Sequence, residues 1–295
     1  MIDVPDYLVD YTDLILDEEN DWDLVESCDD NRYVNEHLFT QEQLDRGYRR
    51  GILNKERTED GGIRYKAGFF MRAIDCCMRS RRPYWDSIPS DIREKYVFLM
   101  QDAEKWIINE PDDLIVEVLP IEYALDKVKE GEGIFFLQEC DCRNYRGDCG
   151  KPKDTCLHFP KDIINTQLDR GNAKKITREE AYEVLKRADK AGLIHCFEGN
   201  GFCNCCSDCC WSLRQKERCE KEFGFNLREQ KYRCNFIISA RYEKCKNCGA
   251  CVSICPFGVL SKGDNHVEVD SSKCWGCGVC RTRCRFDALE IVKFR

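Results

Sequence analysis

Two cysteine runs of one design, both within residues 245–284, constrain this chain more than any other feature. The first reads Cys245-x2-Cys248-x2-Cys251-x3-Cys255-Pro256, and the second reads Cys274-x2-Cys277-x2-Cys280-x3-Cys284. Four thiolates in each run match the ligands of two cubane [4Fe–4S] clusters. Three cysteines at this spacing bind one cube, and the fourth ligates the other cube. Zinc ribbons fit less well, because they need two CxxC pairs separated by a longer loop.

The spacing therefore predicts two crossed ligand sets. One consists of Cys245, Cys248, Cys251 and Cys284, and the other of Cys274, Cys277, Cys280 and Cys255. The stretch from about residue 236 to 295 resembles the bacterial two-cluster ferredoxins. That resemblance implies a (βαβ)2 domain over residues 233–295 that carries single electrons. Arg285 stands where proline often follows the second motif, and proline is not a ligand.

The composition favours a metal or redox protein of a reducing compartment. The chain has 23 cysteines among 295 residues, and its first thirty residues contain twelve acidic residues but no Lys or Arg. Such a start is not a signal peptide, and no apolar run approaches the ~18 residues of a membrane helix. We therefore expect a cytoplasmic protein without membrane contact, and clusters of this kind suggest an anaerobic host.

Charge is unevenly distributed along the chain, whose net charge is −8. Residues 1–30 form an acidic arm, most simply a solvated one, although it could dock on the basic C-terminal part of its own chain or of a neighbour. Arg281, Arg283 and Arg285 surround Cys284. They either tune a cluster and guide an acidic partner, or offset the negative cluster–thiolate units. The oligomeric state stays open.

Residues 31–111 are predicted to form a helical, winged-helix-like domain. A capping box from Thr40 to Gln43 starts a helix, and Asp60-Gly61-Gly62 forms a hairpin turn. We interpret the domain as a packing or docking module, because the acidic chain disfavours nucleic acid as a partner. Cys76 and Cys77 are expected to be buried small hydrophobic residues.

Residues 112–232 are predicted to form a small cysteine-rich α/β and helical domain that begins after a boundary at residues 110–113. Strands at 114–119 and 134–137, joined by a helix, suggest a parallel β-α-β pair. A second capping box, from Thr177 to Glu180, starts a helix that precedes a strand at 193–197. Ligands of open parallel sheets bind beyond the carboxyl ends of the strands, where the cysteines of this region begin.

Nine cysteines of this region are candidate metal ligands. They are Cys140, Cys142, Cys149, Cys156, Cys203, Cys205, Cys206, Cys209 and Cys210. A cubane takes at most four cysteines, so nine thiols suit two four-ligand sites with one over. The foremost interpretation is one or two further Fe–S clusters that form a wire into the C-terminal clusters.

Two other interpretations remain for these thiols. A zinc site would use the tract from Cys140 to Cys156. A cluster with an open iron, or a redox-active Cys206-x2-Cys209 dithiol, would make Cys206 and Cys209 catalytic candidates. His158 and His195 are substitutes for a missing ligand, and Arg143 and Lys151 are donors to a cluster sulfur or an anionic substrate.

The whole chain resembles little-described cysteine-rich 4Fe–4S-binding proteins of anaerobes. The resemblance rests on CDCR with Cys149 and Cys156-Leu-His-Phe, on the Gly-Leu-Ile-His strand and on CNCC-x2-CC before the last region. It implies no particular reaction. Short motifs for dinucleotide or phosphate binding and for radical chemistry are not found in the sequence, and a flavin stays open.

Together these features predict an α+β iron–sulfur redox protein, either an oxidoreductase or an electron-transfer component of one. Two C-terminal [4Fe–4S] clusters would exchange electrons with a protein redox partner and with a cysteine-ligated centre in the middle domain. Whether that centre serves a small-molecule substrate stays open. One alternative is a non-enzymatic electron carrier or subunit with a structural zinc or Fe–S site. The other is an Fe–S-sensing winged-helix regulator.

Overall fold

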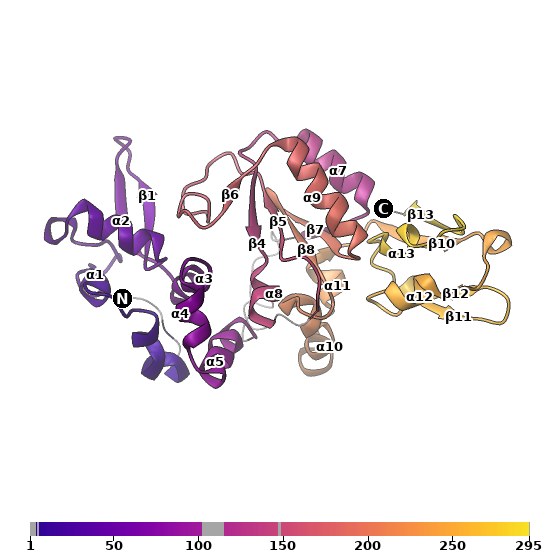
Figure 1. Ribbon diagram of the computed structural model, residues 1–295, viewed down its shortest axis with the longest axis horizontal. Coiled ribbons are helices and arrows are strands. Elements are labelled where there is room, and N and C mark those ends of the chain that lie inside the picture. The colour runs from indigo at the N-terminus through magenta and orange to yellow at the C-terminus, as the bar shows by residue number, and fades with distance from the viewer. Residues whose placement is uncertain (1–3, 5, 102–114, 147–148, 295) are drawn as a thin grey trace. The chain divides into compact units, whose positions relative to one another are not determined.

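The computed structural model describes residues 4, 6–101, 115–146 and 149–294 (Figure 1). The chain divides into two compact units. The first combines residues 1–103 with 163–174, and the second combines residues 104–162 with 175–295. The boundary predicted at residues 110–113 lies outside the described residues. The regions predicted as a middle domain and a C-terminal domain lie largely within the same second unit.

The first unit is mainly helical and contains one β-hairpin. Thr40 and Gln43 form the predicted capping box, and Gly61 has the positive φ, 84°, that the hairpin turn requires. Cys76 and Cys77 are buried as expected, and burial raises the pKa of each thiol to about 11. The elements are η1 (Asp6–Leu14), α1 (Asp21–Glu26), η2 (Glu36–Leu38), α2 (Gln41–Arg49), β1 (Leu53–Arg57), β2 (Ile63–Ala67), α3 (Phe70–Ser80), α4 (Arg82–Ser87) and α5 (Ser90–Gln101).

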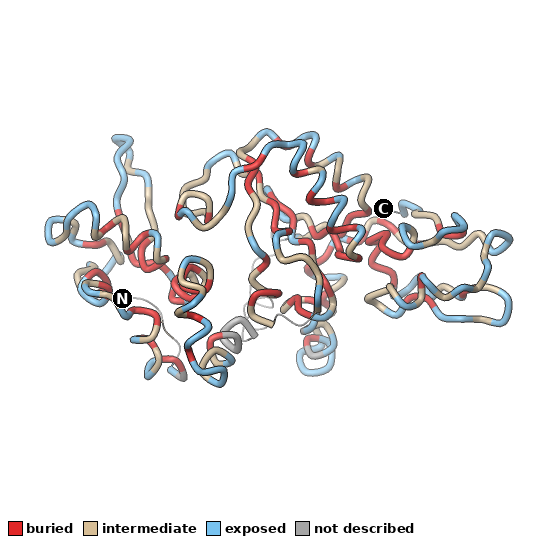
Figure 2. Tube along the Cα trace, viewed as in Figure 1, coloured by how far each residue is buried: buried red, intermediate tan, exposed pale blue. Residues whose placement is uncertain are grey.

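The acidic N-terminal segment is not a solvated arm, which corrects the prediction from charge. Several of its apolar residues, among them Leu8, Ile15 and Leu24, are buried within the first unit (Figure 2). Arg50 pairs with Asp21 at 2.8 Å, and Arg81 pairs with Asp17 at 2.6 Å. The charge pattern alone was misleading for two reasons. The acidic residues are interspersed with buried apolar residues, and some of them form ion pairs with arginines that follow later in the chain.

Residues 163–174 belong to the first unit although they lie far along the sequence. The Arg170 side chain is buried and donates hydrogen bonds to the carbonyl oxygens of Tyr48 and Leu53. Asn165 and Lys55 exchange two hydrogen bonds, at 2.7 and 2.8 Å. This segment is hydrogen-bonded to residues of α2 and β1. No sequence pattern predicted that it belongs to the first unit.

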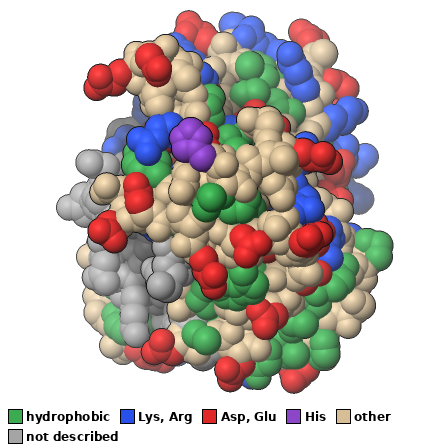
Figure 3. Space-filling view, turned by 90° about the vertical axis from the view of Figure 1, so that its left-hand side faces the viewer, with side chains coloured by type: hydrophobic (Ala, Val, Ile, Leu, Met, Phe, Trp, Pro, Cys, Tyr) green, Lys and Arg blue, Asp and Glu red, His purple; other side chains and the backbone are tan. Residues whose placement is uncertain are grey.

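Figure 3 shows side chains of both charges on the face that it draws. Lys and Arg side chains there are interspersed with acidic ones along the upper right edge, and the lower part is mainly acidic and hydrophobic. The charge on this face is therefore mixed.

The second unit is built on a seven-stranded mixed sheet with the order β6-β4-β5-β8-β7-β3-β9. The strands predicted at 114–119 and 134–137 are β3 and β4. They are not a neighbouring parallel pair, because β7, β8 and β5 lie between them and pair antiparallel. The elements are β3 (Val116–Leu119), α7 (Ile121–Glu130), β4 (Phe136–Glu139), α8 (Asp141–Arg146), β5 (Asp154–His158), β6 (Lys174–Lys175), α9 (Arg178–Lys190), β7 (Ile194–Glu198), β8 (Gly201–Cys205), α10 (Trp211–Phe223), α11 (Leu227–Gln230) and β9 (Tyr232–Arg233).

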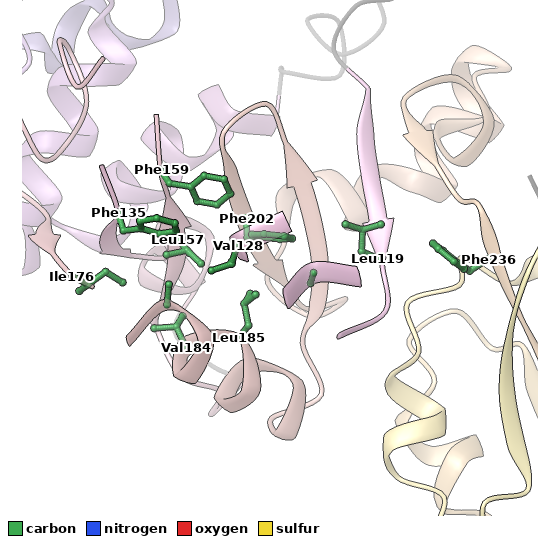
Figure 4. Packing of buried hydrophobic residues seen from close by; sticks show 12 residues of the cluster. Leu119, Val128, Phe135, Leu157, Phe159, Ile176, Val184, Leu185, Phe202 and Phe236 are labelled. Atoms are coloured by element: carbon green, nitrogen blue, oxygen red, sulfur yellow. The ribbon is translucent and has the colours of Figure 1, made fainter. Parts of the chain in front are cut away.

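Helices α7 and α9 cover one face of this sheet. Thr177 and Glu180 form the predicted capping box at the start of α9. Leu157 and Phe202 project from paired positions of β5 and β8 into the core beneath the helices, which contribute Val128 and Leu185 (Figure 4). Because side chains alternate along a strand, Cys156 and Cys203 project from the opposite face. The cysteines therefore lie on the face of the sheet that α7 and α9 do not cover.

The C-terminal region, residues 233–295, follows the order strand, helix, strand twice. Its outer strands β10 and β13 pair antiparallel, as do β11 and β12. The region packs on the rest of the unit: Arg281 pairs with Glu122 of α7 at 2.6 Å, and Arg283 donates to the carbonyl oxygen of Lys190. The elements are β10 (Phe236–Ala240), η3 (Tyr242–Lys244), α12 (Ala250–Ile254), β11 (Leu260–Lys262), β12 (Val267–Val269), η4 (Ser271–Lys273), α13 (Val279–Thr282) and β13 (Leu289–Lys293).

Within the described ranges, no helix is both long enough and apolar enough to cross a membrane.

Candidate metal centres

The two cysteine runs of the C-terminal region adopt matching turns. Asn247 and Gly276 occupy equivalent positions with φ of 47° and 69°, and each backbone N–H lies 3.4 Å from the sulfur of the cysteine two residues earlier. A Cβ on Gly276 would lie 2.2 Å from the carbonyl oxygen of Phe236, so this position requires glycine. N–H groups directed at sulfur stabilise thiolates and the clusters they bind.

The second predicted set of four thiols surrounds one small cavity. Cys255 from the first run joins Cys274, Cys277 and Cys280 from the second run in its lining. Burial raises the pKa of Cys277 and of Cys280 as free thiols. Buried thiols that are costly to ionise unaided, arranged together with Cys255 around a small apolar cavity, fit a cluster whose iron neutralises them.

The first predicted set lies nearer the surface. Cys251 is buried, and burial is the main cause of the raised pKa of its thiol. The charges of Cys284 and Cys245 raise that pKa further. Cys245 and Cys284 are half-buried, and Cys248 is exposed. The Cys284 sulfur accepts a hydrogen bond from the N–H of Ala288 at 3.3 Å. This set therefore faces solvent, whereas the second set faces the interior of the unit.

Six of the nine middle cysteines form a closed ring in which each thiol shifts the pKa of its two neighbours, and we call this group the thiol ring. Each sulfur is linked to the next around the ring, and the last returns to the first. In order, the members are Cys140, Cys142, Cys210, Cys205, Cys203 and Cys156.

The ring assembles from three kinds of position. Cys156, Cys203 and Cys205 lie on β5 and β8, on the sheet face away from α7 and α9. Cys140 and Cys142 lie at the start of α8, and Cys210 is the N-cap of α10. Five members are buried or half-buried, and Cys203 is exposed. The ring is therefore reached from solvent at Cys203.

Protons are shared unevenly around the ring. Hydrogen bonds from the two flanking thiols lower the pKa of Cys140, of Cys203 and of Cys210. The three members between them are Cys142, Cys156 and Cys205. Their pKa values are raised, because they donate hydrogen bonds to those sulfurs. A lowered pKa favours the thiolate, and the thiolate is the form that binds metal.

Cys196 is a further member that sequence reasoning missed. It lies on β7 opposite Cys203, and its sulfur is hydrogen-bonded to that of Cys205. A single cysteine inside a strand reads as a core residue, and only the pairing of β7 with β8 places it beside the ring. Cys196 also connects to the C-terminal region, since its charge contributes to the raised pKa of Cys277.

The other three candidates form a separate group, the thiol triad of Cys149, Cys206 and Cys209. All three sulfurs lie within 4.8 Å of one another, and those of Cys149 and Cys206 are 3.9 Å apart. Nine thiols therefore divide into six and three. The tract from Cys140 to Cys156, considered above as one zinc site, is split between the ring and the triad.

The charged side chains predicted near these thiols take different roles. Arg143 is buried, donates to the carbonyl oxygen of Asn204 at 2.9 Å and interacts electrostatically with Cys206. Lys151 lies 3.5 Å from the carbonyl oxygen of Gly192 and 3.9 Å from Asp208. Arg143 thus stands between the ring and the triad, and Lys151 lies on the triad's side.

The two histidines lie on opposite faces of the sheet. His158 stacks on Phe136 and helps to lower the pKa of Cys203. Nδ1 of His195 lies 2.6 Å from Oδ1 of Asn204, on the α9 side. His195 is accordingly part of the buried scaffold beneath β8, whereas His158 is close enough to act on the ring electrostatically.

Residues 244–288 match a known family, the 4Fe-4S dicluster domain. The match includes all eight cysteines of the two runs. No curated protein matches the chain. An iron–sulfur region suited to electron transfer is thus recognised at the C-terminus.

Proposed function

We propose that the protein moves electrons between a partner protein and a third metal centre, held by the thiol ring, through two C-terminal [4Fe–4S] clusters. Cys245, Cys248, Cys251 and Cys284 bind the outer cluster, and Cys274, Cys277, Cys280 and Cys255 bind the inner one. The supporting observation is the proximity of the inner set to the ring. Cys277, Cys196 and Cys210 belong to one buried core around Trp275.

That core gives the electron a short apolar route. Trp275 stacks on Phe257 with ring centroids 4.5 Å apart, and the ring of Tyr232 lies 4.9 Å from Trp275. Cys277 and Cys196 are electrostatically coupled within the same core. Because the outer set has exposed Cys248 and the inner set is buried, the outer cluster would meet the partner and the inner one the ring.

The spread of the ring favours a polynuclear iron–sulfur centre. Among the described residues, three thiols lie mutually within 4.8 Å only in the triad, so the ring is too wide for one ion to bind several members at once. A centre with several irons can bind sulfurs that are further apart, and soft thiolates suit iron–sulfur clusters. Six thiols exceed the four that a single cubane uses.

An oxidoreductase role follows from this arrangement. Cys203 is the exposed member of the ring, so a small substrate would approach the centre there. The outer cluster would deliver or remove single electrons. Thiol rings of this kind persist in a reducing compartment, which fits a cytoplasmic protein.

Iron analysis after anaerobic purification tests this proposal. We expect more than about eight irons per chain, the number that two cubanes contain. Cys203→Ser and Cys142→Ser should remove the excess and leave about eight. The matched control is Cys77→Ser, a buried thiol of the first unit, which should change nothing. A wild-type chain with only about eight irons would reduce the protein to a two-cluster carrier.

A further inference from the structure

The thiol triad has the dimensions of a site for one ion. Zinc binds thiolates at about 2.3 Å in a tetrahedron, which places neighbouring sulfurs roughly 3.8 Å apart. The Cys149 and Cys206 sulfurs are 3.9 Å apart, and Cys209 completes a group within 4.8 Å. We propose that Cys149, Cys206 and Cys209 bind a single zinc-like divalent cation, separate from the iron–sulfur centre of the ring.

The chain builds two of these ligands into a tight turn. Cys206 and Cys209 are separated by two residues just after β8, and the N–H of Cys209 lies 3.4 Å from the Cys206 sulfur. Both side chains are only 1% exposed and pack against Ala188 and Leu193. A backbone N–H directed at sulfur favours the thiolate, which is the form a cation binds.

Cys149 approaches from a distant part of the sequence. It precedes Lys151 and is half-buried, whereas the two other ligands are fully enclosed. A redox-active dithiol would need only Cys206 and Cys209. The third sulfur at 3.9 Å gives the set the composition of a metal site instead.

The charge of the site is balanced by a buried cation. Three thiolates around a divalent ion carry a net charge of −1, and burying such a charge without a partner is costly. Arg143 is 1% exposed and interacts electrostatically with Cys206. Its guanidinium offsets that charge. Because Arg143 also interacts with Cys140 and Cys156, the cation site would fix the arginine beside the ring.

Zinc and iron analysis of the full chain, purified anaerobically, tests this proposal. We expect about one zinc per chain, because a mononuclear site holds one ion. Cys149→Ser and Cys206→Ser should lower the zinc content at least about tenfold and leave the iron content unchanged. Cys203→Ser in the ring is the matched control and should lower iron but not zinc. Reloading with Co²⁺ should give thiolate-to-cobalt absorption bands in the wild type and not in Cys149→Ser.

The outcomes separate this site from the iron–sulfur centre. Zinc that persists in both triad variants, iron lost from them in place of zinc, or a Cys206–Cys209 disulfide in the anaerobic protein would each overturn the proposal. If Cys206→Ser fails to fold, the zinc content of Cys149→Ser still tests the proposal. The Cys149 side chain is nearer the surface, so its substitution disturbs the fold less. A chain with about one zinc and only eight irons would keep the triad site and refute the ring centre.

Discussion

The C-terminal region and the middle of the chain both gather cysteines, but in different ways. In the C-terminal region, each run of four cysteines folds by a local turn, and Asn247 and Gly276 take up the same left-handed conformation. In the middle, Cys142, Cys156 and Cys210 come from a helix, a strand and a helix cap. A repeated local motif tolerates changes elsewhere in the fold, whereas the ring and the triad depend on the whole sheet.

The sharpest test of a locally built site is Gly276→Ala. Its Cβ would lie 2.2 Å from the Phe236 carbonyl oxygen, on a backbone with φ of 69°. We expect the inner cluster to be lost, about four irons per chain, and the other iron to remain. Iron analysis with electron paramagnetic resonance of the reduced protein measures both.

The matched control for this change is Gly258→Ala. Gly258 also has positive φ, 63°, but a Cβ there has open space around it. Only the backbone cost of roughly 1–2 kcal/mol should appear. If Gly276→Ala kept its full iron content, the turn would not be the determinant of cluster binding.

Arg143→Met tests the tertiary site at its most buried charge. The substitution leaves the carbonyl oxygen of Asn204 and the Thr155 hydroxyl without their donor and removes the cation beside both thiol sets. We expect the second unit to lose about 3 kcal/mol and the ring to lose metal. The C-terminal clusters should remain, as measured by their reduced spectra and by thermal unfolding.

Arg143→Lys separates charge from hydrogen bonding. It keeps the positive charge but not the planar set of donors. An intermediate loss of metal is expected, and equal behaviour of the two variants would show that charge plays no part.

Asn204→Ala tests the scaffold beneath the ring. Asn204 lies between Cys203 and Cys205 on β8, and its amide contacts His195 and the carbonyl oxygen of Thr155, each at 2.6 Å. Removing these buried hydrogen bonds should cost about 2 kcal/mol and weaken metal retention by the ring. Asn200→Ala, an exposed position on the turn before β8, is the control and should match the wild type in stability and iron content.

The smallest expected effect lies in the first unit, which contributes no proposed ligand to either kind of site. Burial opposes ionisation of Asp17, but hydrogen bonds from Arg81 and Arg50 outweigh it and lower its pKa. Since the folded pKa lies below the unfolded one, this stabilisation is present above about pH 4 and is lost as the pH falls through the folded value.

Asp17→Asn should therefore destabilise the first unit by on the order of 1 kcal/mol at pH 7 and by less near pH 3. Its metal content should equal that of the wild type. Thermal unfolding at the two pH values measures the first effect. A loss of iron in this variant would contradict the assignment of all metal ligands to the second unit.

The sequence by itself determined the paired C-terminal cysteine runs, which match the 4Fe-4S dicluster domain, and the two capping boxes, and it proposed the nine middle candidates. These features are local, since a CxxCxxC run or a capping box involves residues within one or two turns of chain. The tertiary structure alone decided that the nine thiols divide into six and three, that Cys196 joins the ring and that residues 163–174 complete the first unit. The physical reason is strand pairing. Which cysteines meet depends on β8 lying between β5 and β7 and on the register that sets Cys196 opposite Cys203. Long-range contacts of this kind leave no periodic signal in the chain.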